Sequence, residues 1–246
     1  MCFSYAVNFS QTQLQSQLDL NNLGPVQGQP EIPNPGYFLS GFAHPLMPIV
    51  SSKEGQTWLE NAHWGLVPSW AASAEKAREL AAMGLNARSE TVAEKPLFRG
   101  AWKRQACLVP MTGFFEWKQE GKRKLPHFIY ASDQRLLLAA GITDVWADPE
   151  TGEQVQTFSI LTTEANALMA EIHNVKKRMP VLMQDASDAQ RWLRGRPEQR
   201  FDLLKPATDS LLKAHRVADF VSRAGEDRNR VECQKAFDEP RQASLF

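Results

Sequence analysis

The chain has 246 residues, of which 43% are hydrophobic and 23% are charged. These values fit one large or two small globular domains, and they exclude a disordered or fibrous chain. The 28 basic side chains equal the 28 acidic ones in number, so any nucleic-acid site must be a local patch rather than a field of the whole protein.

The three cysteines lie far apart in the sequence, at Cys2, Cys107 and Cys233. No CxxC or HExxH motif occurs, and the histidines show no ligand spacing, so we expect no disulfide framework, no metal site and no cofactor. The N-terminus lacks the pattern of a signal peptide, and no apolar run reaches membrane-spanning length. We therefore expect a cytoplasmic protein without a membrane segment, whose thiols stay reduced.

The N-terminal half combines short strands, helices and one long loop. In chain order we expect a strand over 1–9, a helix over 10–20, a loop over 21–37, a strand over 45–52, a helix over 74–83 and a short basic helix over 97–105. Ser10 and Ser73 are suitable N-caps, and Gly84 follows the end of the second helix. The prolines of the 45–52 strand favour the edge of a sheet.

The C-terminal half is richer in strands. We expect strands over 106–118, 125–132, 135–146, 157–163 and 178–183, helices over 164–173 and 187–195, and then one more helix, a strand near 215–220 and a polar tail. Strands outnumber helices and do not alternate with them regularly. The expected fold class is therefore α+β, with a curved, mostly antiparallel sheet flanked by short helices.

Cys2 directly follows Met1. If Met1 is removed, Cys2 carries a free α-amine and a thiol on neighbouring carbons, and both have a reactive fraction near pH 7. The pair can attack one carbonyl carbon twice, first as the amine and then as the thiolate. The alternative is a cysteine that occupies position 2 without any chemical role.

Three further polar residues are candidates for chemistry. Asn86 follows a helix terminator, in the irregular setting where functional side chains often lie. Glu116 lies among aromatic residues in GFFEWK, and a carboxylate in apolar surroundings suits proton transfer; the alternative is the solvent face of a strand. His173 ends a helix, where the helix dipole alone also accounts for a histidine.

Basic and aromatic residues offer possible contacts to nucleic acid. Arg88 lies close to Asn86, and Lys176, Lys177 and Arg178 form either a solvated turn or a phosphate contact. Trp64 and Trp70 flank a Gly/Pro turn. Tryptophans in such a place either belong to the core or stack beside nucleobases.

These segments together resemble the SRAP family, the SOS-response-associated peptidases or abasic-site processing proteins. The resemblance runs in order along most of the chain, through Cys2 after Met1, WGLVPSW (64–70), NARSET (86–91), GFFEWK (113–118) and IH…RMPVLM (172–183). It implies one SRAP-type α+β domain over 1–225, a polar tail over 226–246, and a positively charged groove for single-stranded DNA. It also implies a monomer that acts in the DNA damage response.

The resemblance further implies a covalent reaction with abasic sites. Members of the family lose Met1 by self-processing and cross-link to the ring-opened aldehyde of an abasic site. The α-amine of Cys2 forms a Schiff base, and the thiolate closes a thiazolidine ring. Matched residue by residue, Asn86 would orient the amine, Glu116 would move protons and His173 would assist opening of the sugar. The DNA contacts implied are those of Trp64, Arg88, Ser89 and Arg178.

The sequence departs from the family pattern at several places. Phe3 and Ser4 stand where the family has Gly-Arg, which removes an expected phosphate contact. The segment 40–48 differs from the family's N-x-[AS]-P, and NVKK lengthens the spacing between His173 and Arg178. From about residue 185 the resemblance is weak.

Two other functions stay open from the sequence. An N-terminal-nucleophile amidotransferase also begins with Met-Cys, but it needs an Asn-Gly pair as oxyanion donor and this chain has none. A relative that binds DNA without the chemistry would result if the changes after Cys2 disabled the nucleophile.

Overall fold

The computed structural model describes residues 2–223 and 225–237 of the chain. Within these ranges the α-helices are α1 (Gln11–Leu20), α2 (Ala74–Met83), α3 (Pro96–Arg104), α4 (Ala167–Ile172), α5 (Ala186–Arg194) and α6 (Pro197–Arg200). The described helices have at most 10 residues, and none is long and apolar enough to cross a membrane.

The strands are short in the N-terminal part and longer in the centre of the chain. They are β1 (Ser4–Ala6), β2 (Val26–Gln27), β3 (Leu39–Ser40), β4 (Leu46–Lys53), β5 (Gln56–Trp64), β6 (Asn86–Arg88), β7 (Ala106–Met111), β8 (Gly113–Glu120), β9 (Arg123–Ala131), β10 (Leu137–Ala147), β11 (Gln154–Glu164), β12 (Arg178–Pro180) and β13 (Leu212–Arg216). This content confirms the predicted α+β class.

The larger sheet curves into a closed ring. Its strand order is β12-β11-β10-β7-β4-β5-β2, and β6 pairs beside β11. Strand β11 also pairs in parallel with β5, at Thr157↔His63 and Phe158↔Trp64, which closes β11, β10, β7, β4 and β5 on themselves. The other pairs around this ring are antiparallel, as predicted. Closure gives each of these five strands a partner on both sides over part of its length.

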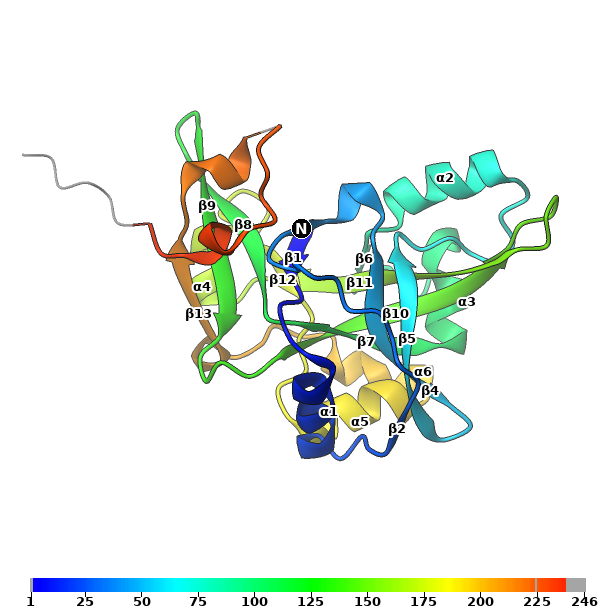
Figure 1. Ribbon diagram of the computed structural model, residues 1–246. Helices are drawn as coiled ribbons and strands as arrows, with labels where there is room; N and C mark the ends of the chain where they lie inside the picture. Colours follow the sequence, from blue (N-terminus) through cyan, green and yellow to red (C-terminus); the bar gives the residue numbers. More distant parts are fainter. Residues whose placement is uncertain (1, 224, 238–246) are drawn as a thin grey trace, which may run out of the picture.

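The smaller sheet stands beside the ring (Figure 1). Its order is β13-β9-β8-β1-β3, and its pairs are antiparallel. The chain passes from ring to smaller sheet between β7 and β8, where only Thr112 separates them, so the single strand predicted over 106–118 is two strands. Gly113 permits this corner, because a Cβ there would lie 2.5 Å from the carbonyl oxygen of Ile129.

The two longest helices begin as predicted. Ser10 and Ser73 each accept a hydrogen bond from the backbone three residues on, at Gln13 and Lys76. These bonds satisfy donors that the first helical turn leaves open. Helices α3 and α5 pack against the ring, and their buried Trp102 and Trp192 rings lie 5.9 Å apart.

Three further strand predictions differ from the structure. No predicted element corresponds to β5, and residues 86–88, expected to be irregular, form β6 beside β11. Three residues are too few to display a strand period in the sequence. The 45–52 strand, expected at an edge, is the interior strand β4. Its pairing with β7 is confined to Val50 and Ser51, so Pro48 still lies where β4 has one partner strand.

The segment after β13 folds back on the smaller sheet. Asn229 Oδ1 accepts hydrogen bonds from the backbone of Tyr37 and Phe38, and Cys233 is fully buried. The part of the expected polar tail over 226–237 is therefore held against the smaller sheet through Asn229 and Cys233, while most of its residues stay exposed. The remainder of the expected tail, 238–246, lies outside the described residues.

Candidate functional site

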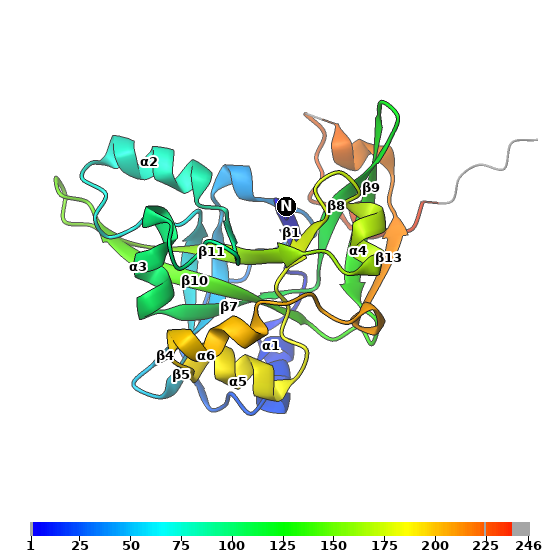
Figure 2. The same ribbon diagram turned by 180° about the vertical axis from the view of Figure 1, so that it is seen from behind.

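Cys2 lies two residues before the start of β1. Figures 1 and 2 show β1 on the side of the smaller sheet that faces the ring of strands. Its side chain is fully buried, with Sγ 3.7 Å from the carbonyl oxygen of Ser4. Burial raises the pKa of the Cys2 thiol above its ordinary value, and the charge of Glu116 raises it further. The thiol in this arrangement is therefore protonated at neutral pH.

Asn86 is joined to Cys2 directly. Strand β6 pairs in parallel with β11, and this pairing turns Asn86 toward the N-terminal segment. Its Nδ2 donates a hydrogen bond of 2.9 Å to the carbonyl oxygen of Cys2. Asn86 Oδ1 is buried, and no residue of the described ranges gives it a hydrogen bond. A buried acceptor in this state is costly unless another donor reaches it.

Glu116 lies on the buried face of β8, which pairs with β1. It is 4% exposed, so the solvent-face alternative is wrong. His173 brings a second ionisable group to the same place, with its Nε2 3.9 Å from Glu116 Oε2. Both contribute to one buried cluster next to Cys2.

His173 is oriented by backbone on both sides. It is the C-cap of α4, and its Nδ1 lies 2.9 Å from the carbonyl oxygen of Arg178. The backbone N–H of Arg178 also lies 3.3 Å from Nδ1. The contact to the carbonyl is the shorter of the two, and because a carbonyl can only accept, it favours a proton on Nδ1. The Nε2 atom, with its lone pair, then faces Glu116.

Glu116 and His173 open onto a pocket of about 570 Å³, here called the site pocket. Its other lining residues are Phe3, Trp117, Gln119, Lys124, Val175, Lys176, Val221, Ser222 and Arg228. Among the described lining residues Glu116 is the one carboxylate, against three fixed cations, so the net charge of these residues is positive. The pocket lies between the smaller sheet, the loop after α4 and the C-terminal segment.

The pocket walls are tied to one another. Asn174 holds the loop after α4 to β8, donating to the carbonyl of Gln119 over 2.9 Å and accepting from its N–H over 3.0 Å. Trp117 Nε1 donates to Ser222 Oγ over 2.7 Å, which attaches the C-terminal segment to the same strand. Lys176 and Arg228 thus project from anchored backbone rather than from free loops.

Arg178 does not lie on the surface. It is 8% exposed, forms a bidentate ion pair with Glu90, and donates to the carbonyl of Thr162 over 2.6 Å. The Arg178 hydrogen bond holds the pKa of the Glu90 carboxyl below its ordinary value. The interpretation of residues 176–178 as a solvated turn therefore fails at Arg178. A phosphate would also have to displace Glu90 to reach it.

The other predicted DNA contacts divide between surface and core. Arg88 is exposed on β6, whereas Ser89 is buried and its N–H bonds the carbonyl of Thr162. Trp64 is fully buried, its Nε1 donates to the carbonyl of Leu85, and its ring centroid lies 4.8 Å from that of Tyr5. Trp64 is a core residue behind the site and does not line the pocket.

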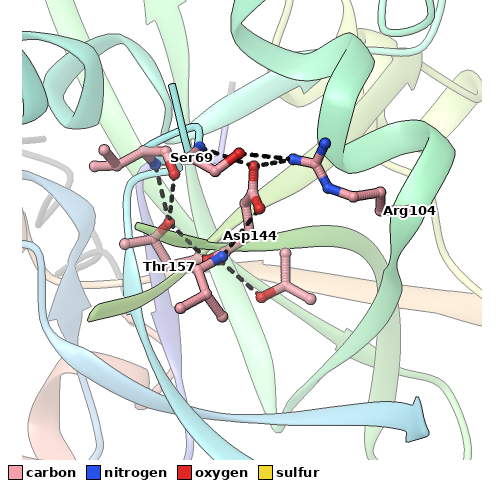
Figure 3. A network of polar contacts seen from close by, with 7 residues as sticks. Ser69, Arg104, Asp144 and Thr157 are labelled. Atoms are coloured by element: carbon pink, nitrogen blue, oxygen red, sulfur yellow. Dashed lines mark hydrogen bonds and ion pairs between the residues drawn. The ribbon is translucent and has the colours of Figure 1, made fainter. Parts of the chain in front are cut away.

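The turn that follows Trp64 is held by a polar network (Figure 3). Thr157 Oγ1 accepts from the N–H of Val67 over 2.9 Å, and Asp144 Oδ2 accepts from the N–H of Ser69 over 3.1 Å. Arg104 pairs with the same carboxylate. The WGLVPSW segment is thereby fixed to β10 and β11, and Trp70 remains 53% exposed at its end.

The family model described as "SOS response associated peptidase (SRAP)" matches residues 1–224. The chain belongs to the SRAP family. Among its relatives, "Abasic site processing protein YoqW" of Bacillus subtilis is 34% identical over 168 residues, covering 67% of this chain and 71% of the relative. "Abasic site processing protein HMCES" of Gallus gallus is 31% identical over 191 residues, covering 69% of this chain and 55% of the relative.

Solved structures agree with the SRAP assignment. A crystal structure of a protein from Bacteroides thetaiotaomicron superposes with a TM-score of 0.83 at 32% identity, covering 96% of this chain and 100% of the other. A protein from Bordetella bronchiseptica gives a TM-score of 0.74 at 22% identity, covering 88% and 100%, which supports the fold alone.

The site pocket contains residues that the sequence analysis did not identify as candidates. Lys124 comes from a polar hairpin, and Arg228 comes from beyond the range that the family model matches. Neither belongs to a motif, so only the folding back of the C-terminal segment reveals Arg228. Within the described ranges no group of three or more His, Cys, Asp or Glu side chains is arranged to hold a metal ion.

Proposed function

We propose that this protein processes abasic sites in single-stranded DNA by linking Cys2 covalently to the sugar aldehyde after Met1 has been removed. The observation that carries the proposal is the hydrogen bond from Asn86 to the Cys2 carbonyl, next to Glu116 and His173 at a cation-lined pocket. Two relatives that share about two thirds of this chain are named abasic site processing proteins.

The first step joins the Cys2 nitrogen to the aldehyde carbon of the ring-opened sugar. The amine lone pair attacks the carbonyl, the oxygen takes a proton, and loss of one water leaves a C=N bond. In the second step sulfur adds to the same carbon, and the thiol proton passes to nitrogen. The product is a thiazolidine, formed with one water released and no oxidant or reductant.

The residues around Cys2 suit these proton movements. Asn86 Oδ1, which no described residue satisfies, is an acceptor for the N–H of a free α-amine and would fix its direction. Glu116 would take a proton from the attacking amine and return it to the departing oxygen. General acid and base catalysis of this kind typically contributes about 10²- to 10⁴-fold in rate.

His173 would act on the sugar before the amine attacks. When the closed deoxyribose opens, its anomeric hydroxyl loses a proton, the bond from C1′ to the ring oxygen breaks, and the ring oxygen takes a proton, which leaves the aldehyde at C1′. With Nδ1 bonded to the Arg178 carbonyl, Nε2 is the basic atom and lies on the pocket side, near Glu116. A neutral imidazole in that position suits removal of the hydroxyl proton.

Removal of Met1 precedes the reaction, since the amine of Cys2 is otherwise part of a peptide bond. Hydrolysis of that bond consumes one water and releases methionine. Asn86 Nδ2 holds the carbonyl on the far side of Cys2, which keeps the Cys2 backbone fixed while the bond before it is cleaved. This accords with the word peptidase in the description of the family.

Single-stranded DNA fits the site pocket better than a duplex. Lys124, Lys176 and Arg228 come from three separate segments and converge on one pocket. Contacts of this kind fix a phosphate backbone without reading its sequence. A single strand can bend its sugar into the pocket without breaking base pairs. In a duplex, base pairs must first be broken, which costs free energy.

One observation favours the alternative of a binding protein without chemistry: the Cys2 thiol is fully buried. Intact-mass spectrometry before and after mixing with a single-stranded oligonucleotide that carries one abasic site separates the two. We expect loss of Met1 and a denaturation-resistant adduct that is absent in Cys2→Ala. Loss of Met1 with no adduct would establish the binding alternative instead. Release of ammonia from glutamine would point to an amidotransferase.

A further inference from the structure

Two phenylalanines form an aromatic pair at the entrance to the site. The ring centroids of Phe3 and Phe42 lie 5.0 Å apart, with 33° between their planes. Phe42 is 69% exposed, among the most exposed large apolar side chains of the described ranges. Phe3 directly follows Cys2 and lines the site pocket with Glu116 and His173. The pair therefore exposes the ring of Phe42 to solvent, and this ring packs on Phe3, the residue that follows Cys2.

The backbone under this pair is fixed from both sides. Phe42 is the middle residue of the 3₁₀ helix η1 (Gly41–Ala43), and the N–H of Gly41 donates to the carbonyl of Phe3 over 2.8 Å. His44 ends η1 in a left-handed conformation, and its Nδ1 lies 2.8 Å from the carbonyl oxygen of Trp64. The backbone that carries the exposed ring is therefore held in place without a ligand.

Gly41 brings this turn close to the core. A Cβ at position 41 would lie 3.0 Å from the ring of Trp64, which is itself fully buried. Trp64 therefore packs directly against η1, whose middle residue Phe42 is exposed. This gives the buried tryptophan of the WGLVPSW segment a part in positioning the exposed phenylalanine.

Phe42 is an exposed ring next to a pocket, and the described residues of that pocket indicate which partner would cover it. They include Lys124, Lys176 and Arg228, with Glu116 as the one carboxylate among them. A flat apolar ring next to a cationic pocket is complementary to a polyanion with flat apolar groups. Single-stranded nucleic acid has both features, and aromatic side chains are the usual platforms for its bases.

We infer that Phe42, supported by Phe3, stacks on the nucleobase that neighbours the abasic site. This inference rests on the proposed function. An abasic nucleotide offers no base of its own, so the neighbouring base is the first planar group that can fix the strand beside Cys2. Stacking is tolerant of sequence because every base has a π-face, and substitution of one such ring by alanine typically weakens binding by roughly 5- to 150-fold.

The test is a thermodynamic cycle that measures DNA affinity after removal of the Phe42 ring, after removal of the bases that neighbour the abasic site, and after removal of both. Binding is measured with Cys2→Ala, which cannot form the adduct, and with Cys2→Ala combined with Phe42→Ala. One oligonucleotide carries a tetrahydrofuran abasic analogue with normal bases on both sides. The second replaces both neighbouring nucleotides by the same base-free analogue. We expect Phe42→Ala to lose at least fivefold in affinity for the first oligonucleotide and less than twofold for the second.

Further variants distinguish stacking from other contacts. Phe42→Trp should keep or increase affinity for the first oligonucleotide, whereas Phe42→Leu should lose it although it stays apolar. Phe201→Ala is the matched control: Phe201 is also a half-exposed ring, but it packs on Trp102 and does not line the pocket. It should bind both oligonucleotides like the parent.

Three outcomes would overturn the inference. One is an equal loss with both oligonucleotides, and another is no loss with either. The third is a change of mass in light scattering on Phe42→Ala, which would make the ring a contact between copies of the chain. Failure of the proposed function has a different signature. In that case the protein with Cys2 intact forms no adduct with a true abasic oligonucleotide, whatever the binding cycle shows.

Discussion

Asn86 donates its side-chain N–H to the carbonyl oxygen of Cys2 across 2.9 Å, so a residue of β6 fixes the segment that would carry the nucleophile. The same amide leaves its Oδ1 buried without a hydrogen bond from any residue of the described ranges. One side chain therefore holds Cys2 in place and offers an acceptor to the amine.

Asn86→Asp separates these two functions. Aspartate keeps an acceptor but has no N–H for the Cys2 carbonyl. We expect cross-linking to slow by about 10²-fold, similar to removal of one preorganised donor elsewhere. Affinity for single-stranded DNA should hold within about twofold. Gel quantification of the adduct over time gives the rate. The control is Asn61→Asp, which alters an amide that bonds the backbone of Glu31 and does not line the site pocket. An unchanged rate would remove Asn86 from the mechanism.

Glu116→Gln tests proton transfer. Glutamine keeps the shape and can hydrogen bond, but it cannot accept a proton and become neutral. We expect the rate of adduct formation to fall by about 10²- to 10⁴-fold, with DNA binding nearly unchanged. The measurement is single-turnover cross-linking at saturating protein. If the rate is unchanged while affinity falls, Glu116 serves binding rather than chemistry.

The motifs contain four residues that lie close together in the structure, but they do not show the surroundings of each residue, and the catalytic roles stay predictions. Cys2, Asn86, Glu116 and His173 come from four distant segments, and the fold brings them together because β1 lies against β8 while β6 and β12 lie against β11. Sequence spacing cannot express such pairings. The α+β class, by contrast, followed from local periodicity alone.

The burial of individual side chains is the property that the sequence predicted least well. Trp64 and Arg178 have the chemistry of nucleic-acid contacts, yet one is in the core and the other is neutralised by Glu90. Arg228 shows the converse case. It belongs to a polar stretch with no motif, and it reaches the pocket only because the segment after β13 folds back on the smaller sheet.

Arg228→Ala tests the cationic pocket. The Arg228 guanidinium lies 4.7 Å from the centroid of the Phe38 ring, which holds it in place without neutralising it. If it contacts one phosphate, the plot of log affinity against log salt should become shallower by about 1. Arg230→Ala is the control, since Arg230 packs on Phe220 and does not line the pocket. Equal slopes for Arg228→Ala and its parent would exclude a phosphate contact.

Arg178→Ala should lower the free energy of unfolding more than it lowers the affinity for DNA. It removes the ion pair with Glu90 and the bond to the Thr162 carbonyl, both made by a guanidinium that is 10% exposed. Glu90 is 52% exposed and regains water, so we expect a loss of about 2 kcal/mol in the free energy of unfolding. Urea unfolding measures it. Full stability combined with a weaker salt dependence of DNA binding would restore the phosphate role instead.

Stability should fall on the alkaline side because of buried thiols. Burial raises the pKa of the Cys107 thiol above its ordinary value, and burial raises the pKa of Cys233 to about 12. In the unfolded chain these thiols ionise near pH 8.5, so above that pH the unfolded state binds fewer protons than the folded state. The stabilisation is complete below about pH 8.5 and is lost as pH rises toward the folded pKa.

Cys107→Ala isolates one thiol of this effect. Each fully buried thiol contributes a slope of up to about 1.4 kcal/mol per pH unit between pH 8.5 and its folded pKa. We expect the variant to be less stable than the parent at pH 7, because it loses buried volume, but to show a shallower decline between pH 8.5 and 10.5. Urea unfolding at half-unit steps of pH gives both quantities. Parallel curves for variant and parent would mean that Cys107 ionises as easily in the folded protein as in the unfolded chain.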